Sequence, residues 1–180
     1  MSQTVTYTID PVHSTAGFKI RHLMVANVRG EFPGLSGTIV FDPANPTNSR
    51  VDADIDVTTL TTRDTQRDAH LKSPDFFDAA QFPTMHFASR TVTPLLNGGG
   101  EWKVTGDLTI HGITKEVTLD VEGPTQEVKD PWGNVKAGIV ASTKINRKDY
   151  GLTWNAALET GGVLVGDDVQ IQIEAELARQ

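Results

Sequence analysis

Apolar and polar residues alternate along much of this chain, which is the pattern of a β-strand with one buried face and one solvent-facing face. The clearest run is 169–177, in which every odd position is apolar and every even position is polar. Aspartates take the polar positions of a second run, 51–57, and a third run, 16–22, places Phe18 and His22 on one face. Further strands are predicted at 4–9, 36–41, 84–95, 108–110, 117–121 and 135–145.

Turn residues separate these runs. Asp42-Pro43 and the segment 130–134, which reads Asp-Pro-Trp-Gly-Asn, are typical of tight turns and loops. Short strands at even spacing favour a sandwich or a barrel, whereas a parallel sheet would need a helix between strands. We therefore predict an all-β fold, an antiparallel barrel of about eight strands.

One helical insertion, near residues 62–78, interrupts the strands. Thr61 is placed to cap the helix, with Asp64 three positions later, and 63–72 contains no Gly or Pro. A short turn is expected to follow at Ser73-Pro74. The helix has two equally suitable docking places, the mouth of the barrel or elsewhere on the sheet. We expect the segment to be mobile, because a closed barrel needs a gate.

Composition limits the function classes. The 180 residues suit one domain, 1–180, that buries roughly 70% of the unfolded surface on folding. A net charge of -7 opposes binding to nucleic acid and to anionic membrane surfaces. No apolar run approaches the ~20 residues that span a bilayer. The N-terminus shows no secretion leader, so the sequence as written predicts a cytoplasmic protein, or a periplasmic or secreted one if a leader has been removed.

Catalytic and metal-binding patterns are not found. The chain has no cysteine, and its five histidines form no H-x-x-x-H or H-x-H pair. Neither a G-x-S-x-G motif nor a phosphate-binding loop occurs. We predict no catalytic residue, no metal and no cofactor. A metal site assembled from residues far apart in the chain stays open as an alternative.

His22 is the polar residue with the most informative position, since it continues an inward-facing row near a strand end. Either its ring is hydrogen-bonded to a backbone carbonyl in the core, or it contacts the polar end of a ligand at a cavity mouth.

A closed barrel of this size leaves room for side chains or for one small ligand. Small residues at inward positions enlarge that space; they are Ala16, Ala53, Ala137 or Gly138, Ala141 and Ala175. The strand positions that share the inward face, together with the position of the helical insertion, predict the residues that contact a long apolar ligand. These are Ala16, Phe18, Ile20, His22, Ile39, Ile55, Phe76, Phe77, Leu108, Leu119, Ile171 and Ile173.

Several segments, in order and over nearly the whole chain, resemble the YceI-like proteins. They include DPVHSTAGFKIRHLM at 10–24, DAHLKSPDFFD at 68–78, GDLTIHGIT at 106–114 and INRKDYG at 145–151, with shorter matches at 28–32, 35–37, 54–62, 82–83 and 87–89. The resemblance implies a lipocalin-like extended barrel whose apolar tunnel binds polyisoprenoid chains, such as quinone tails. It also implies homodimers, and it supplies no catalytic residue to transfer.

The leading hypothesis is therefore non-enzymatic binding, storage or transport of a long-chain polyisoprenoid lipid of the isoprenoid quinone or polyprenyl type. One alternative is an enzyme or metal-dependent protein that uses His22. Another is a stress-response interaction module in which the cavity is incidental.

Overall fold

The computed structural model describes residues 3–95 and 99–180. Its strands are β1 Val5–Ile9, β2 Thr15–His22, β3 Ala26–Phe32, β4 Leu35–Phe41, β5 Arg50–Asp56, β6 Thr84–Pro94, β7 Glu101–Ile110, β8 Ile113–Glu122, β9 Val128–Lys129, β10 Val135–Asn146 and β11 Val165–Arg179. The helix α1 spans Thr65–Lys72, and short 3-10 helices lie at Pro11–His13, Pro46–Asn48, Val57–Thr59 and Arg147–Tyr150. Among these described residues, no helix has the length and apolar character needed to span a bilayer.

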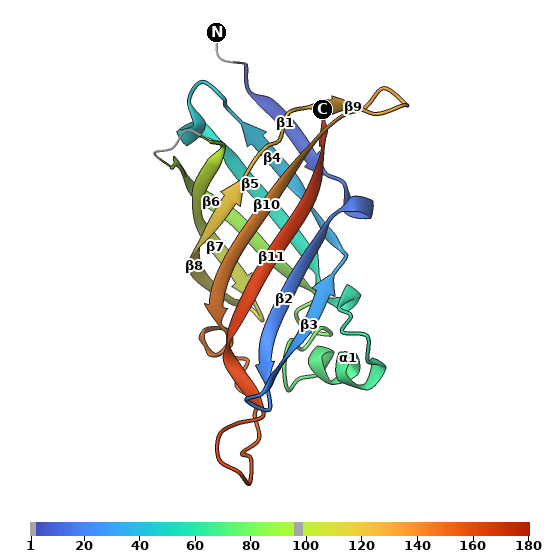
Figure 1. Ribbon diagram of the computed structural model, residues 1–180, viewed down its shortest axis with the longest axis vertical. Coiled ribbons are helices and arrows are strands. Elements are labelled where there is room, and N and C mark those ends of the chain that lie inside the picture. Colours follow the sequence, from blue (N-terminus) through green and yellow to red (C-terminus); the bar gives the residue numbers. More distant parts are fainter. Residues whose placement is uncertain (1–2, 96–98) are drawn as a thin grey trace.

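Eight of the described strands close into a ring. Their order around the barrel is β1, β4, β5, β6, β7, β8, β10 and β11, and β11 returns to β1. Every neighbouring pair is antiparallel, from β1–β4 through to β10–β11. The predicted all-β, eight-stranded antiparallel barrel with a helical insertion is confirmed (Figure 1).

The long strand β11 holds the ring together. Along one edge it pairs with β10 over eleven residue pairs, from Lys136↔Ala178 to Asn146↔Asp168. Its other edge is shared, since β2 pairs with its first part and β1 with its last residues. The Pro11–His13 turn separates β1 from β2, so these two strands serve as successive halves of one wall.

The hairpin of β2 and β3 extends this wall toward α1. Strand β3 pairs residue by residue with β2, from Ala16↔Phe32 to His22↔Ala26. The alternation pattern did not predict β3, because a glycine interrupts its inward row. The glycine is required by packing: a Cβ at Gly30 would collide with the ring of Phe18.

Helix α1 is shorter than the predicted insertion and begins later. Its N-cap is Asp64, whose carboxylate accepts a hydrogen bond from the Arg67 backbone N–H at 2.9 Å. Thr61, the predicted cap, instead exchanges two backbone hydrogen bonds with Glu31, each of 3.0 Å, and is therefore held in extended conformation. After Ser73 the chain makes turns rather than helix.

The buried apolar side chains form two clusters. The first, in the half of the barrel that contains β1, includes Tyr7, Leu35 and Leu177. The second lies across β6, β7 and β8 and reaches α1 through Phe76 and Leu71. The helix and the turns after it thus dock at one end of the barrel, beside β3, as the mouth alternative predicts (Figure 1).

Candidate ligand-binding cavity

The barrel encloses a cavity of about 530 Å³. This volume is within the range of pockets that bind small molecules. The alternation of each strand directs every second side chain inward, so the cavity wall is built from Ile, Val, Leu and Ala side chains of facing strands. In β11, for example, Val169, Ile171, Ile173 and Ala175 all line it.

The structure brings all twelve sequence-predicted residues to this one cavity. From the strands these are Ala16, Phe18, Ile20, His22, Ile39, Ile55, Leu108, Leu119, Ile171 and Ile173, and from the turn after α1 they are Phe76 and Phe77. Contact with a ligand stays a prediction.

Small side chains leave much of the space in the middle of the barrel. Ala16, Ala53, Ala141 and Ala175 line the cavity, as their inward-facing strand positions predicted. Ala137 lies instead in the cluster around Leu177, near the start of β10, where side chains fill the interior.

The polar residues of the lining gather at the end of the barrel where α1 lies. Arg21 and His22 come from the last residues of β2, and Arg67 and His70 come from α1. Arg147 arrives from the turn after β10. The cavity is therefore apolar along the strands and polar at one end, which we call the mouth.

The His22 ring is half-buried at the mouth. Within residues 3–95 and 99–180 it has no hydrogen-bond partner, so the alternative of a core histidine bonded to a carbonyl does not hold in this structure. Its ring nitrogens are left for a polar group of a ligand or for water.

Arg147 is the buried cation of the mouth, with 4% of its surface exposed. Its guanidinium donates hydrogen bonds of 2.7 Å to the Leu152 carbonyl and 2.8 Å to the carbonyls of Trp154 and Gly166. Burial lowers the pKa of this group from its ordinary value, and the negative charge of Asp167 opposes that shift. Arg147 thus fixes the 152–166 segment against the end of β10.

Tyr150 lies one turn further and is 1% exposed. Its hydroxyl is the buried side-chain polar atom without a hydrogen-bond partner in the described chain. Burial raises its pKa to about 12, with a smaller contribution from Asp149. Sequence reasoning did not single out Arg147 or Tyr150, although both lie in the INRKDYG segment at 145–151 that carried the family resemblance.

Aromatic rings join α1 to the opposite side of the mouth. The Trp154 ring centroid lies 4.7 Å from that of His70 and 5.4 Å from that of Phe76. On the other side of the turn, Phe77 packs edge-on against Phe32 at 5.6 Å. These contacts place the helical segment across the end of the cavity.

Two groups of described residues have the spacing that a metal ion requires; the first lies outside the cavity, and the second reaches it only through His86. They are Asp10, His13 and Glu176, and Asp52, Asp54 and His86. In the first group the Lys136 ammonium already lies 2.9 Å from Asp10 and 3.0 Å from Glu176. In the second group both aspartates are exposed and His86 is half-buried, and exposed carboxylates are common without a metal.

Comparison with known proteins agrees with this architecture. A UPF0312 protein of Staphylococcus aureus is 39% identical over 174 residues, which is 96% of each chain. The crystal structure of a Campylobacter jejuni YCEI protein matches with a TM-score of 0.72 and 32% identity, over 89% of this chain and 90% of that one. A polyisoprenoid binding domain from Saccharophagus degradans has a TM-score of 0.67 at 16% identity, over 97% and 98%. The YceI-like domain family matches residues 7–177. The chain therefore belongs to the YceI-like family, with its lipocalin-like barrel.

Proposed function

We propose that the protein binds a long-chain polyisoprenoid lipid without catalysis, for storage or transport. The observation that carries this proposal is the cavity, which is lined by aliphatic strand residues and has its polar groups at the mouth. The polyisoprenoid binding of the Saccharophagus degradans domain supports the choice of ligand.

The physical driving force is burial of the hydrocarbon tail. Each Å² of apolar surface removed from water contributes about 25 cal/mol before the cost of ordering the chain. A tail in the cavity needs no polar contact, whereas a polar head is costly to bury without partners. The head is therefore expected at the mouth, near His22, where an isoprenoid quinone or a polyprenyl head would find hydrogen-bond donors.

Native mass spectrometry of the purified protein, followed by organic extraction, tests the ligand class. We expect a polyprenyl lipid at about one per chain, or uptake of added isoprenoid quinone by the empty protein. Failure of both would contradict the proposal. A stoichiometric metal found by elemental analysis would instead favour the alternative of a metal-dependent protein that uses His22.

A matched pair of variants on β10 tests where the lipid lies. Ala141 is buried and lines the cavity, whereas its neighbour Ser142 is exposed on the outer face. Ala141→Phe should fill the middle of the cavity and weaken binding of a long isoprenoid at least tenfold, an expected loss of about 1.4 kcal/mol. Ser142→Phe should bind as the wild type does. Equal binding by both variants would place the lipid elsewhere.

A further inference from the structure

The turn between β2 and β3 has an unusual composition for an exposed turn. Its three residues are Leu23, Met24 and Val25, and all three are exposed, Val25 by 74%. Leu23 and Met24 also have φ angles of 53° and 62°, a left-handed conformation that glycine and asparagine adopt more easily. Neither solubility nor turn geometry explains apolar residues at this position.

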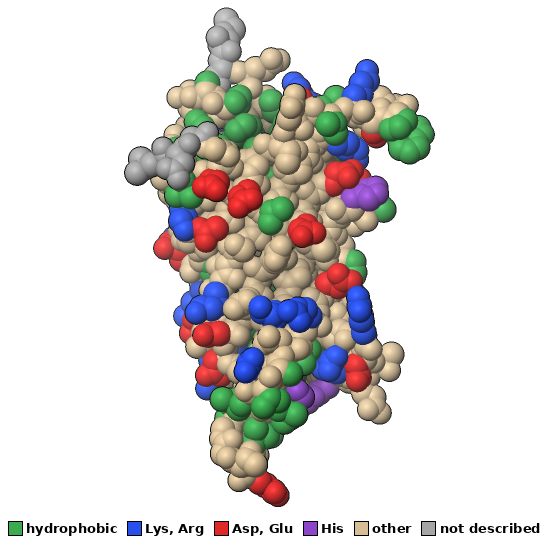
Figure 2. All heavy atoms as spheres, viewed as in Figure 1, with side chains coloured by type: hydrophobic (Ala, Val, Ile, Leu, Met, Phe, Trp, Pro, Cys, Tyr) green, Lys and Arg blue, Asp and Glu red, His purple; other side chains and the backbone are tan. Residues whose placement is uncertain are grey.

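A second loop continues the apolar surface. Leu23 donates its backbone N–H to the Leu164 carbonyl at 2.9 Å, and Gly162 lies so close to Met24 that an added Cβ would be 3.1 Å from the Met24 side chain. Val163, next to them, is exposed. We call Leu23, Met24, Val25 and Val163 the mouth patch, because Leu164 and His22, on either side of it, line the cavity. Figure 2 shows apolar side chains gathered at this lower end of the molecule.

Cations without an ion-pair partner lie on the two strands that lead to the mouth patch, and one of them, Arg21, donates a hydrogen bond to the Met24 carbonyl at 3.0 Å. Residues 15–30 contain Lys19, Arg21 and Arg29 and no acidic residue, in a chain of net charge -7. Lys19 lies directly opposite Arg29 in the β2–β3 register, an arrangement of like charges that destabilises a strand pair. None of the three forms an ion pair with any described residue. Figure 2 shows Lys and Arg side chains, with Asp and Glu side chains among them, just above the apolar lower end, and an acidic side chain at the tip below it.

We propose that the mouth patch docks on the surface of a bilayer that contains anionic phospholipids. The apolar turn would enter the interface, and Lys19, Arg21 and Arg29 would meet lipid phosphates. The negative charge of the rest of the barrel would turn the molecule so that its mouth faces the membrane. Lipid could then pass between bilayer and cavity without crossing water. This last step rests on the proposed function; docking itself does not.

A second group of exposed apolar residues, at the other end of the barrel, is a poorer site for binding a bilayer. Val12, Val128 and Trp132 lie in the half of the barrel away from α1, where two nearby cations are paired and Lys129, next to Val128, has no ion pair with any described residue. Lys136 bridges Asp10 and Glu176, and Arg179 bonds Glu127 at 2.9 Å. Among the described residues, three cations without an ion pair thus lie near the mouth patch, whereas Lys129 is the one beside Val128.

Flotation with lipid vesicles tests the docking. Wild-type protein should float with vesicles of phosphatidylcholine mixed with phosphatidylglycerol, and less with phosphatidylcholine alone or in high salt. A triple variant, Leu23→Ser with Met24→Ser and Val25→Ser, should lose vesicle binding about tenfold or more, as should Lys19→Gln combined with Arg29→Gln. The matched control, Val12→Ser with Trp132→Ser, removes apolar surface from the other end and should float like the wild type.

Three results would overturn the proposal: no flotation of the wild type, loss of flotation in the control variant alone, or a mouth-patch variant that changes only self-association in sedimentation. Binding of a short isoprenoid from solution separates the two proposals. Mouth-patch variants should keep that binding, since none of the substituted residues lines the cavity. If the wild type floats with vesicles but neither it nor any variant binds isoprenoid, the proposed function is refuted and the docking proposal still holds.

Discussion

Two buried tyrosines differ in what their hydroxyls contact. Tyr7 donates to Glu127 at 2.7 Å, and its pKa is raised to about 12, first by burial and then by that carboxylate. Tyr150 is buried to a similar degree and has no partner for its hydroxyl. A buried donor without an acceptor loses its hydration and gains nothing in return, so the two hydroxyls should contribute to stability with opposite signs.

We therefore expect Tyr150→Phe to raise the free energy of unfolding by about 1 kcal/mol and Tyr7→Phe to lower it by a similar amount. Urea unfolding of both variants at neutral pH measures the difference. If Tyr150→Phe destabilised the protein as much as Tyr7→Phe does, the Tyr150 hydroxyl would have to be hydrogen-bonded in solution.

Arg147 permits a second test at the scale of one residue. Arg147→Met keeps much of the volume but leaves the carbonyls of Leu152, Trp154 and Gly166 without their donor, which should cost about 3 kcal/mol. Hydrogen exchange should rise in 152–166 before it rises elsewhere. Lys148→Met, at the next and exposed position, is the control and should change little. An effect of equal size in the two variants would show that Arg147 does not hold the segment.

At the scale of elements, α1 has little buried surface at the barrel's mouth. None of its eight residues is fully buried, and the segment is attached mainly through the turn that contains Phe76 and Phe77. A helix with so little buried surface opens locally at low cost in free energy. This supports the expectation that the segment acts as a gate.

Removing the N-cap should open this gate further. Asp64→Ala should cost about 1 kcal/mol of local stability, which corresponds to about five-fold faster hydrogen exchange of the α1 amides. Lipid uptake should become faster, with little change at equilibrium. Asp64→Asn, which caps equally well, should behave as the wild type. If wild-type α1 amides are already as protected as those of β11, the segment is not a gate.

Period-two alternation predicted the strands and the inward faces well, because a strand alternates its side chains whatever it pairs with. Alternation therefore predicted correctly that Phe18, Ile171 and their neighbours face the cavity. It failed for β3, where Gly30 makes room for another ring. The capping pattern that predicted a helix start at Thr61 also failed, because a backbone pairing with Glu31 holds Thr61 in extended conformation. Alternation could not predict the position of Arg147 either, because Arg147 lies beyond the end of β10, where side chains no longer alternate between two faces.

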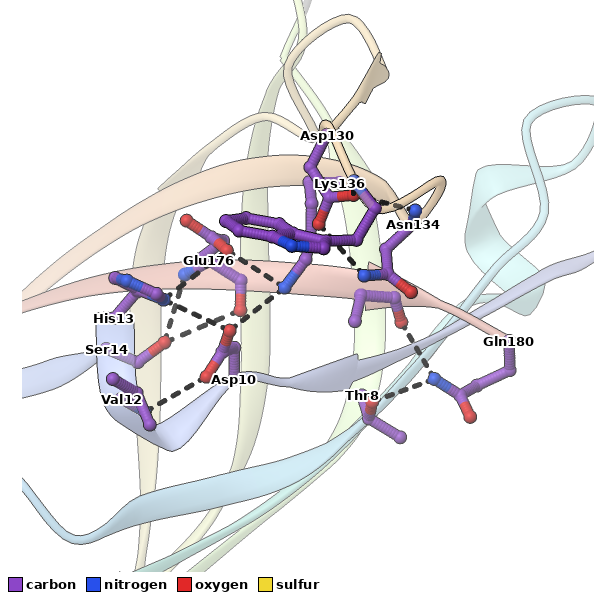
Figure 3. A network of polar contacts seen from close by, with 12 residues as sticks. Thr8, Asp10, Val12, His13, Ser14, Asp130, Asn134, Lys136, Glu176 and Gln180 are labelled. Carbon is purple, nitrogen blue, oxygen red and sulfur yellow. Dashed lines mark hydrogen bonds and ion pairs between the residues drawn. The ribbon is translucent and has the colours of Figure 1, made fainter.

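At the scale of the whole molecule, a polar network connects distant segments at the join between β1 and β2 (Figure 3). Lys136 of β10 bridges Asp10 and Glu176, and His13 lies 3.1 Å from Asp10. The hydrogen bonds from Lys136 and then from His13 hold the pKa of Asp10 well below its usual range. Because the folded state prefers the ionised carboxylate, this interaction stabilises the fold above the ordinary pKa of 3.8 and is lost as the pH falls below it.

Asp10→Asn should therefore be less stable than the wild type at neutral pH, and the difference should shrink as the pH is lowered below about 4. Denaturant unfolding of both proteins at several pH values gives the comparison. A difference that stayed constant down to pH 2 would show that the charge of Asp10 is not the source of the stability.

The shared edge of β11 also has a consequence for how the chain reaches this fold. β11 is the last barrel strand in sequence, yet β1, β2 and β10 all pair with it. During synthesis the earlier strands must wait, with the apolar faces of the future cavity uncovered, until β11 emerges from the ribosome. Contacts that join the first and last strands of a chain form slowly, so the nascent barrel should be vulnerable to aggregation and depend on chaperones until that moment.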